Sequence, residues 1–584
     1  MPLSQRIRTP TVVGGALSLV LGVGLVGLSG LTGLSGSADA ASTAGDTPGY
    51  TTYAAPGSFA DANNAGEPSI GNSFRSGATM YQASLSTYKV DFDDSVTPAK
   101  ATWTDVSANA ANGCPQGSTF SLDPILFTDH ETGRTFESQL SGVDSLTCWT
   151  DDDGATWNPS EGGGIPSGVD HQTVGGGPRA TGDLVSQLGA YPDVVYYCSQ
   201  DIATAFCASS HDGGTTFGPG VPAWTMADCG GLHGHVKVAP DGTAYVPNKD
   251  CGGQAAVVAS TDGGVTWAVH PIPGTAASDA DPSVGIGHDG TVYAGYVDGA
   301  TGKPGVAVSH DHGATWEHVQ ALGSEFGINN AVFPTAVAGD DDRAAVAFIG
   351  TPTAGDYQAT GTFAGVWHLY VATTYDGGAT WSTVDATPGD PVQRGSICTG
   401  GTTCGDDRNL LDFIDATIDD HGRVLVGFAD GCTGACVSDP AQNTHDAYAT
   451  IARQDAGRTL FAQYDAATGP GTPTGGPTAG PVTNLAVHLR RVHRTDGRLV
   501  ARVRLRNTGD VGLMGVAFTV LDRGDRVRRG AVDLAAGASV VRVVRWTPDR
   551  PARRHAVVVE GDPRNRVAES DERDNRDRVV LAAK

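Results

Sequence analysis

The stretch Ser260-Thr-Asp-Gly-Gly-Val-Thr-Trp267 is one of five copies of a short pattern, Ser/Thr-x-Asp-x-Gly-x-Thr-Trp/Phe. The other copies begin at Thr150, Ser210, Ser309 and Thr374, so that successive copies start 60, 50, 49 and 65 residues apart. A period of this size is typical of folds in which one small structural unit recurs along the chain.

Each copy has the chemistry of a hairpin turn between two strands. The Asp carboxylate can accept hydrogen bonds from backbone N–H groups of the turn, and Gly tolerates a positive φ. The Thr and the aromatic residue re-enter a strand, where the ring can pack on a neighbour. The pattern therefore predicts a structural role for five aspartates, which are Asp152, Asp212, Asp262, Asp311 and Asp376.

The five copies resemble the Asp-box (BNR) repeat of the sialidase superfamily. The resemblance implies an all-β fold, a β-propeller with these turns on outer hairpins away from the ligand-binding face. We count seven blade-sized units between Gly57 and about Phe461, with six or eight as alternatives. The propeller is expected over 57–465.

A second repeat precedes the first strand of each unit. An acidic or polar residue, often followed by Pro, stands before a short apolar run, as in Glu67-Pro68-Ser69-Ile70. The innermost strands of a propeller surround its axis, so residues entering them should converge at one mouth. The predicted ring comprises Glu67, Asp123, Asp170, His171, His233, His235, Asp281, Asp412 and Asp415. Acids that only cap loops are the alternative interpretation.

A polar mouth lined by carboxylates and imidazoles is a candidate site. Because paired carboxyl groups suit glycoside hydrolysis, the catalytic candidates are Asp281, Asp412, Glu67 and Asp123. The substrate-binding candidates are Arg408, Asp170, His171, His233 and His235. Arg408 suits a carboxylate or sugar-acid ligand, and a salt bridge with Asp406 or Asp407 is the alternative. The ring could also hold a cation, calcium being the candidate cofactor, but no metal-ligand set can be assigned.

The catalytic set of sialidases is not found in the sequence. The family resemblance implies three arginines on the sugar carboxylate, a Tyr nucleophile with a Glu partner, and a Phe-Arg-Ile-Pro motif. The nearest string, Phe74-Arg75-Ser76-Gly77, lacks the Ile-Pro, and neither the triad nor the Tyr/Glu pair can be assigned. Nine arginines precede the expected linker in the mature chain, at positions 75, 134, 179, 343, 394, 408, 423, 453 and 458.

Two function classes therefore remain open. One is a sialidase-like glycoside hydrolase that acts on an extracellular glycan or polysaccharide at the propeller mouth. The other is a non-catalytic glycan-binding or adhesion protein.

The N-terminus has the features of a secretory signal peptide. Arg6 and Arg8 precede an apolar run from about Thr11 to Leu34, and Ala38-Asp39-Ala40 is a small-x-small cleavage site. We predict a signal peptide over 1–40, an N-terminal segment over 41–56, and a secreted or cell-surface protein. An uncleaved membrane anchor is the alternative; no other stretch is apolar enough to span a bilayer.

The ten cysteines fit an exported protein, in which disulfides are the default. They fall into neighbouring pairs along the chain, with connectivity left open by the spacing. The pairs are Cys114/Cys148, Cys198/Cys207, Cys229/Cys251, Cys398/Cys404 and Cys432/Cys436. The last two pairs also have the spacing of zinc half-sites.

Charge and composition divide the chain. Residues 481–584 contain 22 basic and 13 acidic residues, whereas residues 1–480 contain 16 and 51. A Gly/Pro/Thr-rich linker over 466–481 separates the two parts. The acidic body argues against nucleic acid as a partner. The basic part could touch anionic wall polymers, and a solvated Arg-rich surface is the alternative.

The C-terminal part has strand-like alternation over 485–489, 499–505 and 540–546. Its ending, from Asp562 to Asn575, is similar to the close of a CARDB-type, cell-adhesion-related module. The resemblance implies an immunoglobulin-like β-sandwich over 482–584 that serves as a spacer or adhesive unit.

Overall fold

We analyse a computed structural model of the chain. It describes residues 47–465 and 485–581, apart from gaps at 115–120, 122, 142–143, 161–169, 181–190, 202–203, 440–441, 496, 508–511, 535–537, 549, 551 and 562–574. The expected signal peptide, the expected linker and most of the stretch from Asp562 to Asn575 lie outside these residues. No helix in the described part of the chain is long and apolar enough to cross a membrane.

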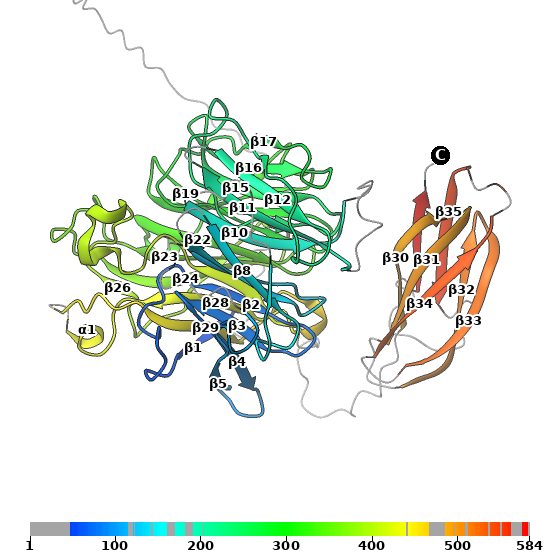
Figure 1. The fold of residues 1–584 in the computed structure, drawn as a ribbon, viewed down its shortest axis with the longest axis horizontal. Helices are drawn as coiled ribbons and strands as arrows, with labels where there is room; N and C mark the ends of the chain where they lie inside the picture. The colour runs from blue at the N-terminus through cyan, green and yellow to red at the C-terminus, as the bar shows by residue number, and fades with distance from the viewer. Residues whose placement is uncertain are drawn as a thin grey trace, which may run out of the picture. The chain divides into compact units, whose positions relative to one another are not determined.

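The larger body consists of seven small antiparallel sheets, so the count of about seven blades is confirmed (Figure 1). Blade 1 consists of β2 (Ser69–Asn72), β3 (Thr79–Ala83), β4 (Ser86–Asp93) and β5 (Lys100–Asp105). Blade 2 consists of β6 (Pro124–Thr128), β7 (Thr135–Ser141), β8 (Asp144–Thr150) and β9 (Asn158–Pro159). Blade 3 consists of β10 (Asp170–Gly177), β11 (Val194–Asp201), β12 (Thr204–Ser210) and β13 (Val221–Pro222).

The next three blades follow the same order along the chain. Blade 4 consists of β14 (Lys237–Val238), β15 (Ala244–Cys251), β16 (Gln254–Ser260) and β17 (Ala268–Pro271). Blade 5 consists of β18 (Ser283–Ile286), β19 (Val292–Asp298), β20 (Lys303–Ser309) and β21 (Glu317–Ala321). Blade 6 consists of β22 (Asn330–Ala338), β23 (Ala344–Thr351), β24 (Val366–Thr374) and β25 (Ser382–Asp385), with β26 (Gln393–Arg394) also paired to β24.

The seventh blade joins the two ends of the propeller. Its strands are β27 (Asp415–Ile418), β28 (Val424–Asp430) and β29 (Tyr448–Ala456), and its outermost strand is β1 (Gly49–Ala54), which pairs antiparallel with β29. The propeller was expected to start at residue 57, but β1 lies before that residue. The N-terminal segment therefore contributes a strand to the propeller. The ring is thus closed by backbone hydrogen bonds.

The first strand of each blade lies at the axis. These strands contact one another in a closed cycle, which runs β2, β6, β10, β14, β18, β22, β27 and back to β2. Each blade packs face to face against its neighbours. Tyr245 and Val257 of blade 4, for example, share one buried cluster with Val284 and Val292 of blade 5.

The five repeat turns are closed by their aspartates. Asp262 Oδ1 accepts hydrogen bonds from the Thr266 amide (2.9 Å) and the Ser260 hydroxyl (3.0 Å), and its Oδ2 accepts one from the Thr266 hydroxyl (2.6 Å). The other four turns repeat these contacts. The aromatic residue of such a turn can contact the preceding blade. The ring centroid of Trp267, in blade 4, lies 6.4 Å from that of Tyr196, in blade 3. The repeat thus ties adjacent blades together.

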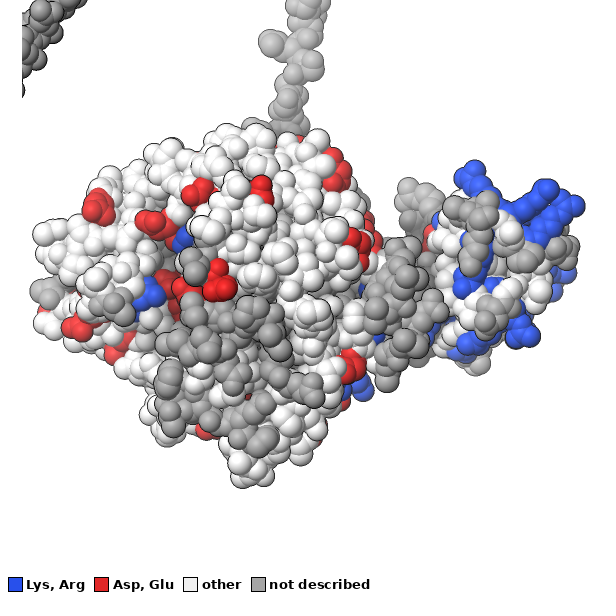
Figure 2. All heavy atoms as spheres, turned by 45° about the horizontal axis from the view of Figure 1, so that its top comes forward, with Lys and Arg blue, Asp and Glu red and all other residues white. Residues whose placement is uncertain are grey.

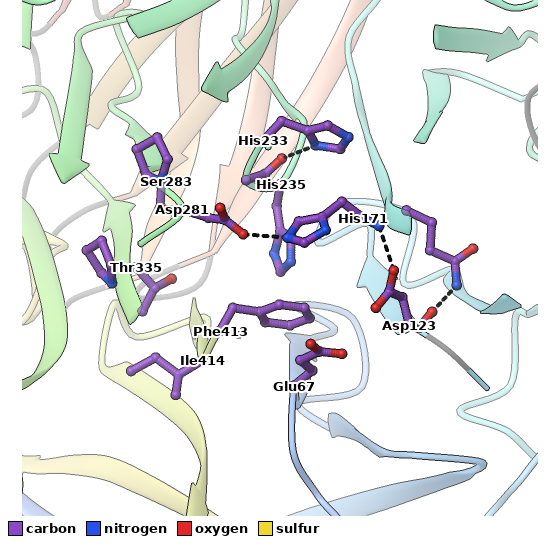
Figure 3. A pocket seen from close by; sticks show the side chains of 14 residues that line it. Glu67, Asp123, His171, His233, His235, Asp281, Ser283, Thr335, Phe413 and Ile414 are labelled. Carbon is purple, nitrogen blue, oxygen red and sulfur yellow. Dashed lines mark hydrogen bonds and ion pairs between the residues drawn. The ribbon is translucent and has the colours of Figure 1, made fainter. Parts of the chain in front are cut away.

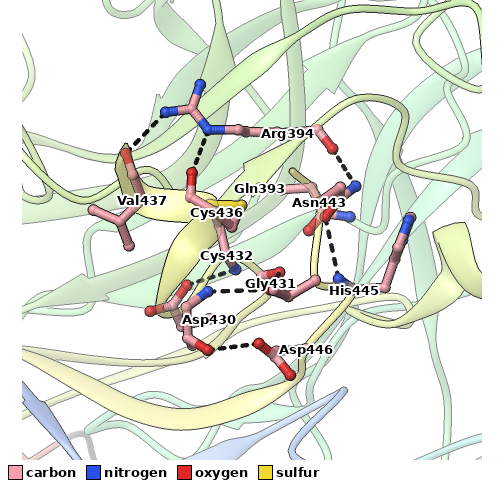
Figure 4. The surroundings of a disulfide bond; sticks show 12 residues. Gln393, Arg394, Asp430, Gly431, Cys432, Cys436, Val437, Asn443, His445 and Asp446 are labelled. Carbon is pink, nitrogen blue, oxygen red and sulfur yellow. Dashed lines mark hydrogen bonds between the residues drawn. A yellow bond between two sulfur atoms is a disulfide. The ribbon is translucent and has the colours of Figure 1, made fainter. Parts of the chain in front are cut away.

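All ten cysteines are paired as their spacing suggested, and the zinc interpretation of two pairs is wrong. The Cys432–Cys436 bond joins the loop after β28 to the short helix α1 (Ala435–Ser438), which contains Cys436 (Figure 4). Arg394 donates hydrogen bonds to the carbonyls of Cys436 (2.7 Å) and Val437 (3.1 Å). The disulfide and this arginine hold the loop against blade 6.

The C-terminal body is a β-sandwich with its own apolar core. One sheet contains β30 (Leu485–Thr495), β31 (Arg498–Asn507) and β34 (Ser539–Trp546); the other contains β33 (Asp525–Leu534), β32 (Leu513–Asp522), β35 (His555–Gly561) and β36 (Arg576–Leu581). Figure 2 shows Lys and Arg gathered on this body and Asp and Glu on the visible face of the propeller. The charge division in the sequence is therefore a division between the surfaces of two bodies.

We predict that Asp262→Ala lowers the free energy of unfolding by about 1–2 kcal/mol, because the turn loses several hydrogen bonds. Burial opposes ionisation of Asp262, but the bonds from Thr266 and Ser260 outweigh it and lower its pKa. The loss should therefore be full above about pH 4, the pKa of the group in the unfolded chain, and should shrink as the pH falls through the lower pKa of the folded state. Urea unfolding at pH 7 and at about pH 2 measures both effects.

The control for this variant is Asp406→Ala. Asp406 is exposed, and its side chain accepts no hydrogen bond from the residues that the structure describes. An equal loss of stability in both variants would contradict the structural role of the turn.

Candidate functional site

All seven blades contribute to one pocket at the propeller axis, which we call the axial pocket (Figure 3). Six members of the ring predicted from the sequence line it, namely Glu67, Asp123, His171, His233, His235 and Asp281. Blades 6 and 7 add Thr335 and Phe413. The enclosed space is about 20 Å³, which is room for a water-sized occupant.

Local backbone geometry places several of these side chains. Glu67 (φ 56°) and His171 (φ 48°), in blades 1 and 3, have left-handed conformations, as does Phe333 (φ 55°) in blade 6. Such values are uncommon for residues other than glycine, and they cost free energy that the surrounding structure must offset. The chain thus turns sharply where it enters these first strands.

His171 joins two blades through its imidazole ring. Its Nε2 lies 2.7 Å from Asp281 Oδ2 of blade 5, and its Nδ1 lies 3.1 Å from Asp170 Oδ1. Burial alone would lower the pKa of His171, but the Asp281 carboxylate and these hydrogen bonds outweigh it and place the pKa well above its usual value. Both nitrogens therefore donate from an imidazolium.

Asp281 is a buried carboxylate held ionised by two cations. Its Oδ1 lies 3.1 Å from Lys249 Nζ, and its Oδ2 contacts His171. Although burial opposes ionisation, these two positive groups hold the pKa of Asp281 well below its usual range. A buried charge without such partners would be strongly unfavourable.

The pKa of Glu67 is shifted in the opposite direction to that of Asp281. Its side chain is 2% exposed, and its Oε2 has no hydrogen-bond partner among the described residues. Burial, together with the nearby carboxyl groups of Asp123 and Asp412, raises the pKa of Glu67 well above its usual value. The surroundings of Glu67 therefore favour its protonated form over the carboxylate.

His233 supplies a neutral nitrogen. It is 2% exposed, its Nδ1 lies 2.9 Å from the carbonyl of Gly234, and its Nε2 has no partner in the described part of the chain. Burial and the positive charge of His171 lower the pKa of His233 to about 4. The pocket therefore contains two histidines in different protonation states.

Asp123 and Asp415 each accept a hydrogen bond from a backbone amide of another blade, and Asp415 also lies close to the imidazole of His235. Asp123 Oδ2 accepts the backbone N–H of His171 (2.5 Å), and burial raises the pKa of Asp123 to about 6. Asp415 Oδ2 accepts the backbone N–H of Ile70 (3.2 Å), and its Oδ1 lies 3.5 Å from His235 Nδ1. These contacts connect neighbouring first strands across the axis.

Arg408 and Asp412 bind each other rather than lining the axial pocket. The guanidinium donates two hydrogen bonds, of 2.7 and 2.6 Å, to the carboxylate of Asp412. The predicted alternative partners, Asp406 and Asp407, were therefore wrong, because the pairing runs forward by four residues out of the short helix η4 (Gly405–Arg408). Each of the two side chains therefore neutralises the charge of the other.

None of the nine propeller arginines lines the axial pocket, and each has a contact elsewhere. Their partners are the carbonyl of Thr132 for Arg75, Asp151 for Arg134, His211 for Arg179, Asp465 for Arg343 and Arg458, the carbonyl of Cys436 for Arg394, Asp412 for Arg408, and Asp94 for Arg423 and Arg453. A site that grips a sugar carboxylate with three arginines is thus not formed by the described residues.

The acidic groups do not fit calcium well. Ligand atoms of Asp123, Asp170 and His171 lie within 4.8 Å of one another. However, both nitrogens of His171 already contact carboxylates, and its raised pKa makes the ring a cation. Calcium prefers six to eight oxygen ligands, and a neighbouring imidazolium repels it.

Sequence reasoning missed Lys249, Gln172 and Phe413. Gln172 follows His171 on β10 and donates to the carbonyl of Asp123, while the Phe413 ring lies 4.7 Å from that of His235. Phe413 could have been found, because it stands at the repeat position of the last blade. Lys249 lies in a second strand, β15, where no repeat marks it.

The C-terminal body has a family match over residues 495–578. It is a CARDB domain. This CARDB domain is similar to that of a Pyrococcus furiosus protein solved in complex with di-metal ions, at 19% identity over 18% of this chain and 96% of that one (TM-score 0.17). No curated protein sequence matches the chain.

Two other solved structures are similar to more than half of this chain. The intramolecular trans-sialidase of Ruminococcus gnavus, in complex with oseltamivir carboxylate, is 12% identical over 68% of this chain and 96% of that one (TM-score 0.35). The fucose-recognising six-bladed lectin of Aleuria aurantia is 10% identical over 58% of this chain and 98% of that one (TM-score 0.36).

We predict that His171 and His233 titrate far apart. His171 should lose its proton only well above the usual histidine value, because Asp281 raises its pKa, while His233 should remain neutral at pH 5. Nitrogen-15 NMR of the imidazole groups measures both, with His171→Gln and His233→Gln assigning the signals.

The same shift has a consequence for stability. A raised folded-state pKa means that the contribution of His171 is fully present below about pH 6.5 and is lost only as the pH rises through the folded value. Titration of both rings near pH 6.5 would contradict the charge network.

Proposed function

We propose that the protein is an extracellular glycoside hydrolase that acts at the axial pocket. The observation that carries the proposal is a pair of carboxyl groups that line one pocket and whose surroundings shift their pKa values in opposite directions. Burial raises the pKa of Glu67, whereas His171 and Lys249 hold the pKa of Asp281 well below its usual range. Two carboxyl groups whose surroundings separate their pKa values are the arrangement that glycosidases use.

In this mechanism Glu67 is the general acid. It passes its proton to the glycosidic oxygen as the bond to the anomeric carbon breaks. The carboxylate of Asp281 faces the positive charge that develops on the sugar ring. Water then adds to the anomeric carbon, and its second proton returns to Glu67. His171 and Lys249 are positioning residues that hold Asp281 ionised.

The other predicted catalytic residues take supporting roles in this proposal. Asp123 fixes the backbone of His171 and raises the pKa of Glu67 by its proximity. Asp412 neutralises Arg408 and also raises the pKa of Glu67. The signal-peptide features, the five disulfides and the CARDB domain support an extracellular setting.

A non-catalytic glycan-binding protein is the second candidate, favoured by one observation. The enclosed space of about 20 Å³ admits a water-sized group but not a whole sugar ring. In that case the sugar would rest across the mouth, and the buried charges would only shape the pocket.

We predict that Glu67→Gln lowers kcat by about 10²- to 10⁴-fold on a cleaved substrate, because glutamine keeps the shape but has no acidic proton. For the wild type, kcat should be constant at low pH and fall as the pH rises through the raised pKa of Glu67. Release of nitrophenol from a panel of aryl glycosides, including a sialoside, measures both.

The control is Glu317→Gln, since Glu317 is an exposed residue of the outer strand β21 that contacts His310. It should leave kcat unchanged. If no glycoside in the panel is cleaved while glycans still bind saturably, the hydrolase proposal fails and the binding candidate stands.

A further inference from the structure

A second cavity lies between blades 4 and 5, and we call it the side groove. Its volume is about 400 Å³, within the range of ligand pockets, roughly 300–1,000 Å³. Gly230, Lys249 and Asp250 of blade 4 form one wall. The opposite wall includes Asp279 of blade 5, and Tyr357 of a blade 6 loop also lines the groove.

Lys249 connects the side groove to the axial pocket. Its side chain lines the groove, while its Nζ lies 3.1 Å from Asp281 Oδ1 in the axial pocket and 3.0 Å from the carbonyl of Asp279. Asp279 lines the groove two residues before Asp281. Lys249 therefore links a residue that lines the axial pocket, Asp281, to one that lines the groove, Asp279.

The blade 4 wall of the groove is rigid. The Cys229–Cys251 disulfide joins the two segments that form it. Next to this bond, the amide of Gly230 donates to the carbonyl of Asp250 (2.9 Å), and Asp250 Oδ1 accepts the amide of Gly253 (2.9 Å). A preformed wall lowers the entropic cost of binding a ligand.

The charges in the groove favour sugars without a carboxylate. Asp250 and Asp279 both line it, and no arginine does so among the described residues. The one cation, Lys249, is paired with Asp281. Carboxylates accept hydrogen bonds from sugar hydroxyl or ammonium groups and repel acidic sugars, so the groove selects by charge.

We propose that the side groove is a second sugar subsite, which holds the residue adjoining the one that lies across the mouth of the axial pocket and prefers neutral or amino sugars to acidic ones. This inference rests on the proposed function. The substrate is then an oligosaccharide that runs from the axis outward between blades 4 and 5, over Lys249.

Gly230→Trp tests the subsite. A Cβ at Gly230 meets no atom within 4 Å, the residue is exposed, and its φ is not positive, so a large ring can fill the groove without distorting the wall. Gly389→Trp is the matched control, because Gly389 is equally open and exposed but lines neither cavity. The probes are aryl monoglycosides and trisaccharides of neutral, amino and uronic acid sugars.

We expect Gly230→Trp to lower kcat/KM on the preferred trisaccharide by about tenfold or more, since binding energy away from the reacting bond is lost. Turnover of the aryl monoglycoside should change less than about twofold, since it lies only at the mouth of the axial pocket and does not reach the groove. Gly389→Trp should change neither. Asp279→Asn should reduce the preference for neutral and amino trisaccharides over the uronic acid trisaccharide.

The outcomes separate the two proposals. If monoglycosides and trisaccharides are both cleaved and Gly230→Trp affects neither, the subsite proposal is overturned and the hydrolase proposal remains. If nothing is cleaved, calorimetric binding of the trisaccharides decides: loss of binding in Gly230→Trp supports the groove as a binding site, and unchanged or absent binding overturns it. A preference for the uronic acid trisaccharide would also overturn it.

Discussion

The pairing of β1 with β29 is the constraint on which the rest of the propeller depends. It joins residues 49–54 to residues 448–456, and it is the contact that closes seven sheets into a ring. Only a closed ring brings the seven first strands around one axis. The axial pocket, which takes a lining residue from every blade, exists because of this closure.

Charge pairing then determines the chemistry of the pocket. Asp281 stays ionised because a lysine and an imidazolium from two other blades contact it, and His171 stays protonated because it contacts two carboxylates. Among the described residues no cation forms an ion pair with Glu67, and burial raises its pKa. Burial without a partner and burial with one thus produce two different carboxyl groups from the same kind of side chain.

Much of the fold and part of the site could be predicted because both are repetitive. The turn around Asp262 recurs five times, and the acidic residue before each first strand marks where Glu67, Asp123 and Asp281 enter the ring. Arg408 shows the limit of this reasoning. Three aspartates lie within four residues of it, and only the helical turn at 405–408 selects Asp412.

The sequence by itself determined the all-β class, the blade repeat and the division into an acidic and a basic body, because these follow from local patterns and composition. The tertiary structure decided which charges meet. Lys249 and Asp281 are 32 residues apart and belong to different blades, and no local pattern links them. Protonation depends on distance and burial, which arise only when the ring closes and removes these side chains from water.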